Sequence, residues 1–223
     1  MKLFSHHLCR CLFICIGLFL SFTINVTAHK IVITGGPGVG KTSLIEDLEK
    51  RGYPVIHEAA TSLIQEELAK GNAHPTSNRD VFQQKLLAKQ IEMEQEHQEA
   101  SLTFLDRGMM DGIAYYNLDG LVVPQALFDA SRKSNYYLIF VLDFLPNPYE
   151  INSVRKEPLE IAQKIHELIK KAYQSFGYTL IAVPPASIED RATFVLNYIQ
   201  EYQQSLQQEK TTSITASLSQ KNK

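Results

Sequence analysis

The sequence predicts an α/β fold with a parallel sheet, and three observations support this prediction. Short runs of β-branched and apolar residues alternate with longer helical patterns along the body of the chain, as in βαβ units. The strand candidates are mostly apolar, as strands covered by helices on both faces must be. Hydrophobic residues make up 44% of the 223 residues and charged residues 21%, so the chain can bury one large core.

The alternation places each element along the chain. We expect strands at residues 30–34, 53–57, 102–106, 136–143 and 179–183. We expect helices at residues 41–51, 59–70, 79–97, 124–132, 158–176 and 188–207. The helix at 158–176 has the clearest apolar stripe, with Pro158 at its start and Gly177 just past its end, which are usual positions for these two residue types.

The two ends differ in composition from this body. Residues 1–28 carry only Lys2 and Arg10 as charged side chains besides an apolar run at 11–20. That run has the length of a signal-peptide core and is shorter than the roughly 20 apolar residues of a membrane span. Residues 1–28 are therefore either a targeting or anchoring segment, which would bring membrane contact, or a spurious extension. The Thr-, Ser-, Gln- and Lys-rich run 211–223 is expected to be a disordered tail, which leaves 29–210 as the folded domain.

Composition and cysteine placement exclude several function classes. Basic residues number 22 and acidic residues 24, and the net charge of −2 gives no electrostatic footprint for a nucleic-acid partner. All three cysteines lie in the first 15 residues, so the body has no thiol for a disulfide, a zinc site or catalysis. No second His follows His57 and Glu58 at the zincin spacing, and no Gly-x-Ser-x-Gly elbow occurs.

A glycine-rich motif between the first strand and the first helix carries the clearest chemistry. The Walker A pattern Gly-x-x-x-x-Gly-Lys-[Ser/Thr] is matched by Gly35, Gly36, Pro37, Gly38, Val39, Gly40, Lys41 and Thr42. Backbone N–H groups of such a loop and the following helix N-terminus bind phosphate oxygens. We expect Lys41 to reach the β- and γ-phosphates and Thr42 to offer its hydroxyl to Mg²⁺, with Ser43 in the first helical turn.

This motif predicts binding of a nucleoside triphosphate. An Asn-Lys-x-Asp loop, expected in a purine-specific GTPase, does not follow a later strand. ATP is therefore the expected nucleotide, and GTP stays open as an alternative. A small-molecule kinase needs basic residues around the γ-phosphate, a carboxylate for the acceptor hydroxyl and a mobile lid, and the chain has candidates for all three.

Charged residues at the ends of later segments are the candidates. Asp106 and Arg107 end an apolar strand, at the edge where open α/β sheets bind ligands. Asp106 would contact Mg²⁺-bound water or accept a proton and Arg107 would bind phosphate oxygens, unless the two form a surface ion pair. Glu58 ends the second strand as another carboxylate, with helix capping as its alternative role. Arg155 lies in the aperiodic stretch 144–157, which is either a phosphate-covering lid or a solvated loop.

Several of these segments resemble the NadR-like AAA-domain ATPase family. The matching segments are 34–42, 57–60, 104–108 with 111–116, and Arg155 ahead of 165–167, and the resemblance covers about 30–202. It implies a three-layer P-loop NTPase fold of the nucleoside and nucleotide kinase type, with a five-stranded parallel sheet in the order 2-3-1-4-5. This fold is related to the ribosylnicotinamide kinase part of NadR.

The resemblance also implies roles for site residues. The pair of Glu58 and Asp106–Arg107 is similar to that of deoxynucleoside kinases, which implies that Glu58 is the base and that Arg107 touches phosphate. Phe82 and Gln83 stand where those kinases line the acceptor pocket. Thr61 departs from the family pattern, which often has Arg at this position. The adenylyltransferase and DNA-binding parts of NadR have no counterpart in this sequence, and their activities are not expected.

The expected function is transfer of the ATP γ-phosphoryl group to a small, nucleoside-like hydroxyl acceptor. The expected catalytic residues are Lys41, Glu58, Asp106, Arg107 and Arg155, and the expected metal ligands are Thr42 and Asp106. The alternative is a regulatory or membrane-trafficking module that hydrolyses ATP or GTP slowly. We expect a cytoplasmic protein, or an anchored or exported one if residues 1–28 are a targeting segment.

Overall fold

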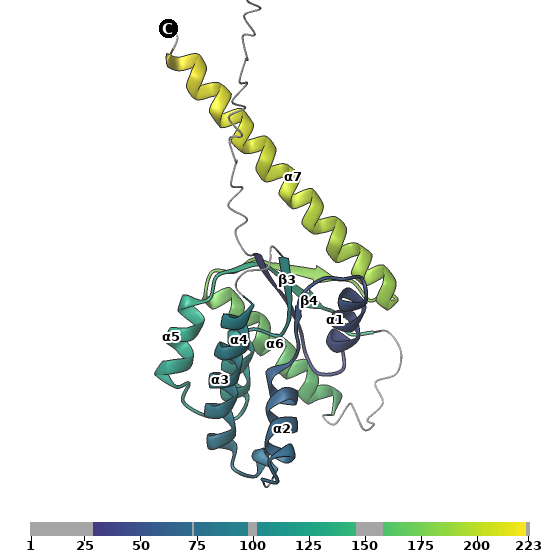
Figure 1. Ribbon diagram of the computed structural model, residues 1–223, viewed down its shortest axis with the longest axis vertical. Helices are drawn as coiled ribbons and strands as arrows, with labels where there is room; N and C mark the ends of the chain where they lie inside the picture. Colours follow the sequence, from purple (N-terminus) through teal and green to yellow (C-terminus); the bar gives the residue numbers. More distant parts are fainter. Residues whose placement is uncertain (1–28, 73, 98–101, 146–157, 222–223) are drawn as a thin grey trace, which may run out of the picture.

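The chain forms a five-stranded parallel sheet between two layers of helices (Figure 1). The computed structural model describes residues 29–72, 74–97, 102–145 and 158–221. The strands are β1 (His29–Thr34), β2 (Val55–Ile56), β3 (Leu102–Asp106), β4 (Tyr136–Leu142) and β5 (Leu180–Val183). Their spatial order is β2-β3-β1-β4-β5, and every pairing is parallel. The predicted fold class and strand order are therefore confirmed.

Helices connect the strands and cover both faces of the sheet. They are α1 (Lys41–Lys50), α2 (Ala59–Ala69), α3 (Arg79–Glu96), α4 (Met109–Leu118), α5 (Gln125–Lys133), α6 (Leu159–Ser175) and α7 (Ile188–Lys221), with a short 3₁₀ turn, η1 (Pro75–Ser77). Ile31 and Ile33 of β1 pack among residues of α1 and α7, whereas Val32 packs among residues of α4 and α6. This alternation follows from the two-residue period of a strand, and it makes β1 the centre of both cores.

Helix α4 is absent from the helices expected from the sequence. Its buried residues lie on more than one side, namely Met109, Met110, Asp111, Ile113, Ala114 and Tyr116. A helix that is buried on several sides lacks a polar face, so its sequence shows no amphipathic period. Gly112 also lowers its helix propensity, and in the fold a Cβ at this glycine would lie only 3.3 Å from the Leu127 side chain of α5.

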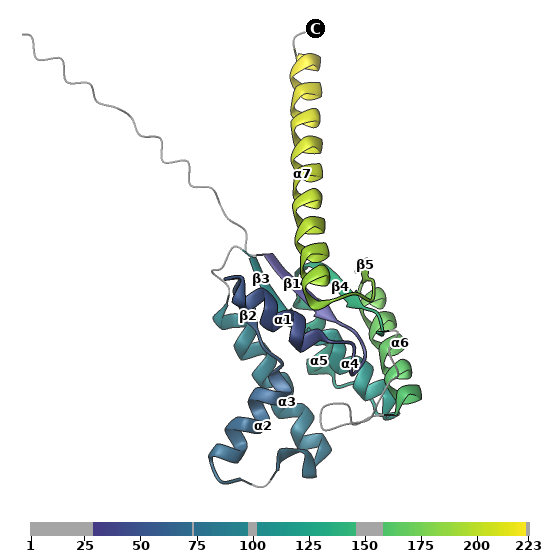
Figure 2. The same ribbon diagram turned by 90° about the vertical axis from the view of Figure 1, so that its right-hand side faces the viewer.

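Helix α7 extends further than the sequence suggested. We expected this helix to end at residue 207 and residues 211–223 to form a disordered tail, but α7 continues to Lys221. No Gly or Pro follows Ile188 to end it, and the Thr211 and Thr212 hydroxyls donate to carbonyls four residues earlier, which keeps them compatible with the helix. The C-terminal part of α7 projects beyond the sheet and its covering helices (Figures 1 and 2).

Strand β2 is shorter than expected. The expectation was residues 53–57, but only Val55–Ile56 is a strand. Pro54 has no N–H to donate, which is tolerated at the edge of a sheet, and its carbonyl accepts from the Phe104 amide at 3.0 Å. Two expectations, the segment 1–28 and the role of Arg155, concern parts of the chain outside the described residues.

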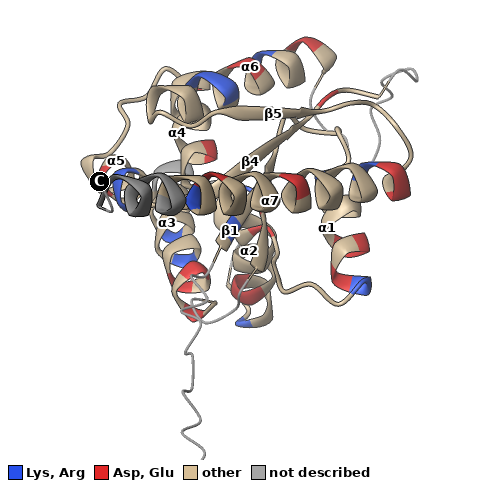
Figure 3. Ribbon diagram, turned by 90° about the horizontal axis from the view of Figure 1, so that it is seen from above, with Lys and Arg blue, Asp and Glu red and all other residues tan. Residues whose placement is uncertain are grey.

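The described surface carries mixed charge. Lys and Arg alternate with Asp and Glu over the helices seen from above (Figure 3), which agrees with the nearly balanced composition. None of the helices in the described ranges has both the length and the apolar character needed to cross a bilayer.

Candidate nucleotide and acceptor site

The Walker A residues form the loop between β1 and α1. Gly35 and Gly40 adopt φ angles of 136° and 90°, which favour glycine because side chains rarely tolerate them. Lys41 is 6% exposed, and its Nζ donates to the carbonyls of Gly35 and Gly36 at 2.9 and 2.8 Å. Burial and the nearby Arg107 lower the pKa of Lys41 to about 8. The loop therefore holds a buried ammonium beside the N-terminus of α1.

Two buried side chains, one from α6 and one from α7, form hydrogen bonds with the backbone of this loop. His166 of α6 accepts a hydrogen bond from the Gly36 amide through Nδ1 at 3.2 Å. Arg191 of α7 donates to the Val39 carbonyl at 2.6 Å and to the Asp143 carbonyl at 3.2 Å. A Cβ at Gly36 would lie 2.7 Å from the Ala162 carbonyl oxygen and 3.0 Å from the His166 Cβ. The shape of the loop is thus set by its packing against α6 and α7.

The register of the sheet brings Asp106 to the loop. Ile33, one residue before the end of β1, pairs with Asp106 at the end of β3. The Thr42 hydroxyl donates to Asp106 Oδ2 at 2.9 Å, whereas the buried Oδ1 of Asp106 has no hydrogen-bond partner. Burial raises the pKa of Asp106, and Lys41 and Arg107 oppose this shift only in part. This carboxylate therefore has an oxygen available for a further ligand.

Thr42 and Asp106 fit a magnesium site of the kind used with nucleotides. Mg²⁺ usually takes one or two protein oxygens and completes its shell with phosphates and waters. The Thr42 hydroxyl and the unpartnered Asp106 oxygen form such a set. A group of three or more His, Cys, Asp or Glu side chains suited to a metal is absent from the described ranges.

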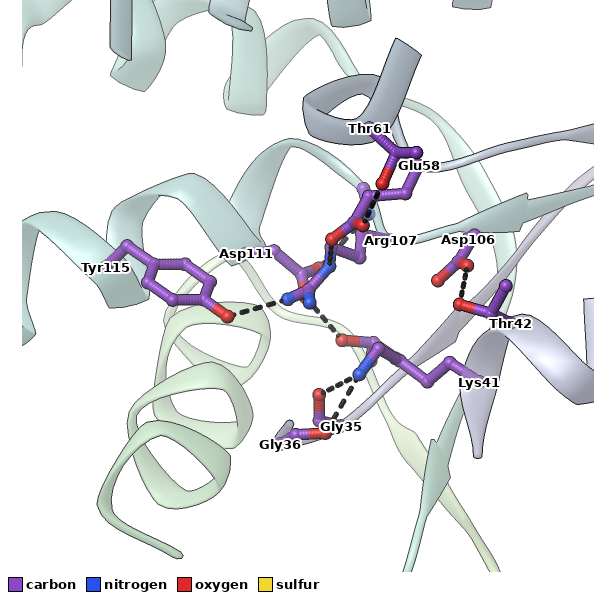
Figure 4. A network of polar contacts seen from close by, with 12 residues as sticks. Gly35, Gly36, Lys41, Thr42, Glu58, Thr61, Asp106, Arg107, Asp111 and Tyr115 are labelled. Atoms are coloured by element: carbon purple, nitrogen blue, oxygen red, sulfur yellow. Dashed lines mark hydrogen bonds and ion pairs between the residues drawn. The ribbon is translucent and has the colours of Figure 1, made fainter. Parts of the chain in front are cut away.

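Arg107 is the centre of a polar network next to Asp106 (Figure 4). Its Nε lies 2.6 Å from Glu58 Oε1, and its Nη1 donates to the Tyr115 hydroxyl at 2.9 Å. Among the described residues it alone has a positive φ without being glycine, at 76°. Backbone strain of this kind is found at sites where the surrounding structure imposes it, often functional ones. The Arg107 guanidinium lies between Glu58 and Tyr115 of α4.

Glu58 is ionised in this network. Burial favours its neutral form, but the Arg107 guanidinium and the Thr61 hydroxyl outweigh burial and lower the pKa of Glu58. Thr61 Oγ1 donates to Glu58 Oε2 at 2.9 Å. The residue that departs from the family pattern therefore supports the carboxylate directly, and both oxygens of Glu58 are oriented.

Asp111 anchors the other side of Arg107. The Asp111 carboxylate lies 3.9 Å from the Arg107 Nη1 and accepts three hydrogen bonds from buried groups. The donors are the Thr34 hydroxyl at 2.7 Å, the Tyr173 hydroxyl at 2.6 Å and the Gly108 amide at 3.1 Å. This single side chain joins the end of β1, the start of α4 and the C-terminal turn of α6.

A cavity of about 700 Å³ opens beside this network. Its walls come from α2, α3, α4 and α5 together with η1, and its volume is within the range of about 300–1,000 Å³ that is usual for small-molecule pockets. The lining combines apolar side chains such as Leu86 and Met109 with Gln83, Gln90 and Tyr115. Glu58, Arg107 and Asp111 supply its charged wall. Phe82 and Gln83 also line it, at the place that the resemblance implied.

The fold brings together most of the residues expected at the site. Gly35 to Ser43, Glu58, Asp106 and Arg107 lie at one edge of the sheet, whereas Arg155 falls outside the described residues. No role was expected for Asp111, Tyr115, His166 and Arg191. Asp111 was detectable in principle, because its spacing of four from Arg107 matches a helical ion pair. His166 and Arg191 lie on amphipathic helices, and no local pattern signals their contacts with the loop.

This chain is similar to proteins of known family and structure. A family model described as AAA domain matches residues 30–191, and no curated protein matches the sequence. A structure of NadR protein in complex with NAD and AMP-PNP superposes with a TM-score of 0.57 at 17% identity, covering 79% of this chain and 49% of that one. The chain thus spans about half the length of that NadR structure.

Two kinases have the same fold. Thymidylate kinase from Candida albicans superposes with a TM-score of 0.58 at 15% identity, covering 79% of this chain and 93% of that one. Deoxyadenosine kinase from M. mycoides gives a TM-score of 0.54 at 14% identity, with coverages of 77% and 99%. Because the family model spans most of the chain, the chain belongs to the AAA domain family, and it shares its fold with NadR and these kinases.

Proposed function

We propose that this chain binds Mg-ATP and transfers the γ-phosphoryl group to a hydroxyl of a nucleoside-like acceptor held in the cavity. The observation that carries the proposal is the position of the cavity: its charged wall, Glu58 and Arg107, is electrostatically coupled to Lys41 of the phosphate-binding loop. A group in the cavity and a triphosphate on the loop would therefore meet across these side chains. NadR and deoxyadenosine kinase, which share the fold, were crystallised with nucleotides.

Each residue of the site has its own role in the proposed reaction. Amides of the loop and the Lys41 ammonium bind the phosphates, with charge-assisted bonds from lysine replacing its contacts to Gly35 and Gly36. Mg²⁺ held by Thr42 and Asp106 would neutralise phosphate charge. The acceptor oxygen bonds to the γ-phosphorus, the bond from this phosphorus to the β,γ-bridging oxygen breaks, and ADP leaves with the electron pair. Glu58 takes the proton of the acceptor hydroxyl, a role that suits a carboxylate ionised at neutral pH.

The charges around the cavity favour an acceptor without a phosphate group. The charged side chains that line it are Glu58, Asp111 and Arg107, two anions and one cation, which sum to −1. Both anions already lie next to Arg107, so its positive charge is largely balanced and would attract a third anion only weakly. A nucleoside monophosphate brings about two negative charges at neutral pH and would meet repulsion here. A neutral or positively charged nucleoside would not.

Acceptor-stimulated ADP release tests the proposal. Purified full-length protein is incubated with Mg-ATP and a panel of nucleosides and nucleoside monophosphates, and ADP is measured with and without each acceptor. We expect stimulation by a nucleoside and loss of that stimulation in Glu58→Gln, with Mg-ATP binding preserved. General-base assistance is worth roughly 10²–10⁴ in rate, so the loss should be unmistakable.

The controls separate this proposal from its alternative. Glu66→Gln changes a carboxylate in α2 that faces Lys89 rather than the cavity, and the stimulated rate should persist. ADP release at the same slow rate with every acceptor would favour a regulatory module with slow hydrolysis. An unchanged stimulated rate in Glu58→Gln would leave Glu58 with a structural role at the start of α2, where its side chain makes no capping hydrogen bond, and Asp106 as the candidate base.

A further inference from the structure

A second polar network lies at the wall of the cavity formed by α3. Gln90 lines the cavity and is 8% exposed. Its Nε2 donates to Glu94 Oε1 at 2.9 Å, one helical turn further along α3. Glu94 is also buried, at 5% exposed. Neither residue takes part in the phosphoryl-transfer steps proposed above, so this pair needs its own explanation.

The direction of every hydrogen bond in this network is determined. The Tyr136 hydroxyl accepts from the Met109 amide at 2.9 Å, so its own proton points to Glu94 Oε1, 2.8 Å away. The Lys30 ammonium donates to the carbonyl of Glu94 at 2.7 Å and lies 3.3 Å from Oε2. A carboxylate surrounded by these donors is an acceptor only. Gln90 must therefore turn its amide nitrogen, and not its carbonyl, toward Glu94.

This orientation decides what Gln90 presents to the cavity. With one N–H committed to Glu94, the carboxamide retains its carbonyl oxygen and one N–H for a ligand. Reversal of the amide would place two oxygens in contact and leave a buried carboxylate without a donor, which is costly in a poorly solvated site. Gln90, which lines the cavity, can thus offer its carbonyl oxygen to a ligand there among mostly apolar neighbours, and such polar groups determine which ligands fit.

We propose that Gln90, oriented by Glu94, is a specificity-determining residue that selects acceptors with an amino group over isosteres with a carbonyl oxygen at the same position. The inference rests on the proposed function in one respect, that the cavity holds the acceptor. Adenosine and inosine form such an isosteric pair, as do cytidine and uridine. In each pair the amino member can donate to Gln90 Oε1, whereas the other member turns a carbonyl oxygen toward it.

Calorimetric titration of the full-length protein with these four nucleosides tests the proposal without requiring turnover. We expect the amino member of the better-binding pair to bind about tenfold more tightly or more, the effect of one buried hydrogen bond against an unpaired acceptor. Equal binding within both pairs, tighter binding of inosine or uridine, or no binding of any of the four would overturn it.

Three variants separate orientation from packing. Gln90→Met keeps the length of the side chain and should abolish the preference, whereas Gln95→Met, which changes an exposed glutamine of the same helix outside the cavity lining, should retain it. Glu94→Gln can offer its amide nitrogen to Gln90, which lets Gln90 reverse, so the preference should fall to within about twofold because neither partner is then an acceptor only. Tyr136→Phe removes the hydroxyl that donates to Glu94 but leaves Glu94 an acceptor for Gln90, so the preference should persist.

The outcomes of this experiment and of the kinase assay are distinct. Absence of acceptor-stimulated ADP release together with an intact amino preference would reject phosphoryl transfer and keep the Gln90 inference. Stimulated ADP release without the amino preference would support phosphoryl transfer and reject the Gln90 inference. If Glu94→Gln does not fold, as judged by urea unfolding, Gln90→Met and Tyr136→Phe still decide the question: a preference that survives Gln90→Met refutes the role of Gln90.

Discussion

Replacement of Asp111 by Ala tests how the site is built. The Asp111 side chain is buried, and its removal leaves the Thr34 hydroxyl, the Tyr173 hydroxyl and the Gly108 amide without their acceptor. Each unsatisfied buried donor costs about 1–3 kcal/mol. Because the two hydroxyls can rotate to weaker partners, we expect a total loss of about 3–6 kcal/mol. This is a large part of the roughly 5–15 kcal/mol by which a domain is stable.

Urea unfolding, followed by circular dichroism, measures this loss as a change in the free energy of unfolding. Asp129→Ala is the matched control, because Asp129 lies on α5 in an exposed contact with Gln125, and its loss should be within about 0.5 kcal/mol. Asp111→Asn keeps one acceptor oxygen, so its loss of unfolding free energy should lie between those of Asp111→Ala and Asp129→Ala. A loss below about 1 kcal/mol for Asp111→Ala would refute the three-donor arrangement.

Three further predictions concern the phosphate-binding loop and its neighbours. Lys41→Ala should weaken Mg-ATP binding at least tenfold by calorimetry, since charge-assisted bonds contribute about 1.5–3 kcal/mol. In the unmodified protein, the affinity for Mg-ATP should fall as pH rises above the Lys41 pKa of about 8. Asp106→Asn should weaken Mg²⁺-dependent nucleotide binding at least tenfold. The same variant should raise the free energy of unfolding near neutral pH, because the raised pKa of Asp106 means that the fold disfavours its charged form. His166→Asn, whose amide oxygen can still accept from Gly36, should make stability less sensitive to acid, because burial and the nearby Lys170 lower the pKa of His166.

The sign of each pH effect follows from linkage. A histidine whose pKa is lowered by folding contributes stability above its ordinary value of 6.5 and loses it as pH falls through the folded value. Thermal unfolding between about pH 5 and 7.5 should therefore show a steeper decline for the unmodified protein than for His166→Asn, and parallel profiles would contradict the bond to Gly36. The stability gain of Asp106→Asn should vanish in acid, where the unmodified carboxyl is protonated too; a gain that persists there would have another cause. Lys50→Ala, an exposed lysine of the same helix, should leave Mg-ATP affinity unchanged, and the pH dependence above 8 should be absent from Lys41→Ala.

Hydrophobic periodicity in the sequence predicted the elements that present one face to the core. The stripe of α6 appears in the sequence because the helix packs on one side only, with Ala162, Ile165 and Ile169 buried. The strands of the central sheet were found as short apolar runs for a related reason, since helices cover both faces. Helix α4 was missed because it is buried on several sides, and the true end of α7 was missed because a polar sequence without Gly or Pro carries no stop signal.

The sequence by itself determined the α/β class and the phosphate-binding loop. Both depend on local patterns: hydrophobic period in one case, and in the other a run of eight residues whose backbone binds phosphate wherever a strand precedes it and a helix follows. The tertiary structure decided what surrounds that loop. Parallel pairing of β1 with β3 brings Asp106 to Thr42, and packing of α6 and α7 brings His166 and Arg191 to the loop from more than a hundred residues away. Contacts between distant segments depend on how the layers pack, and no short stretch of sequence encodes that packing.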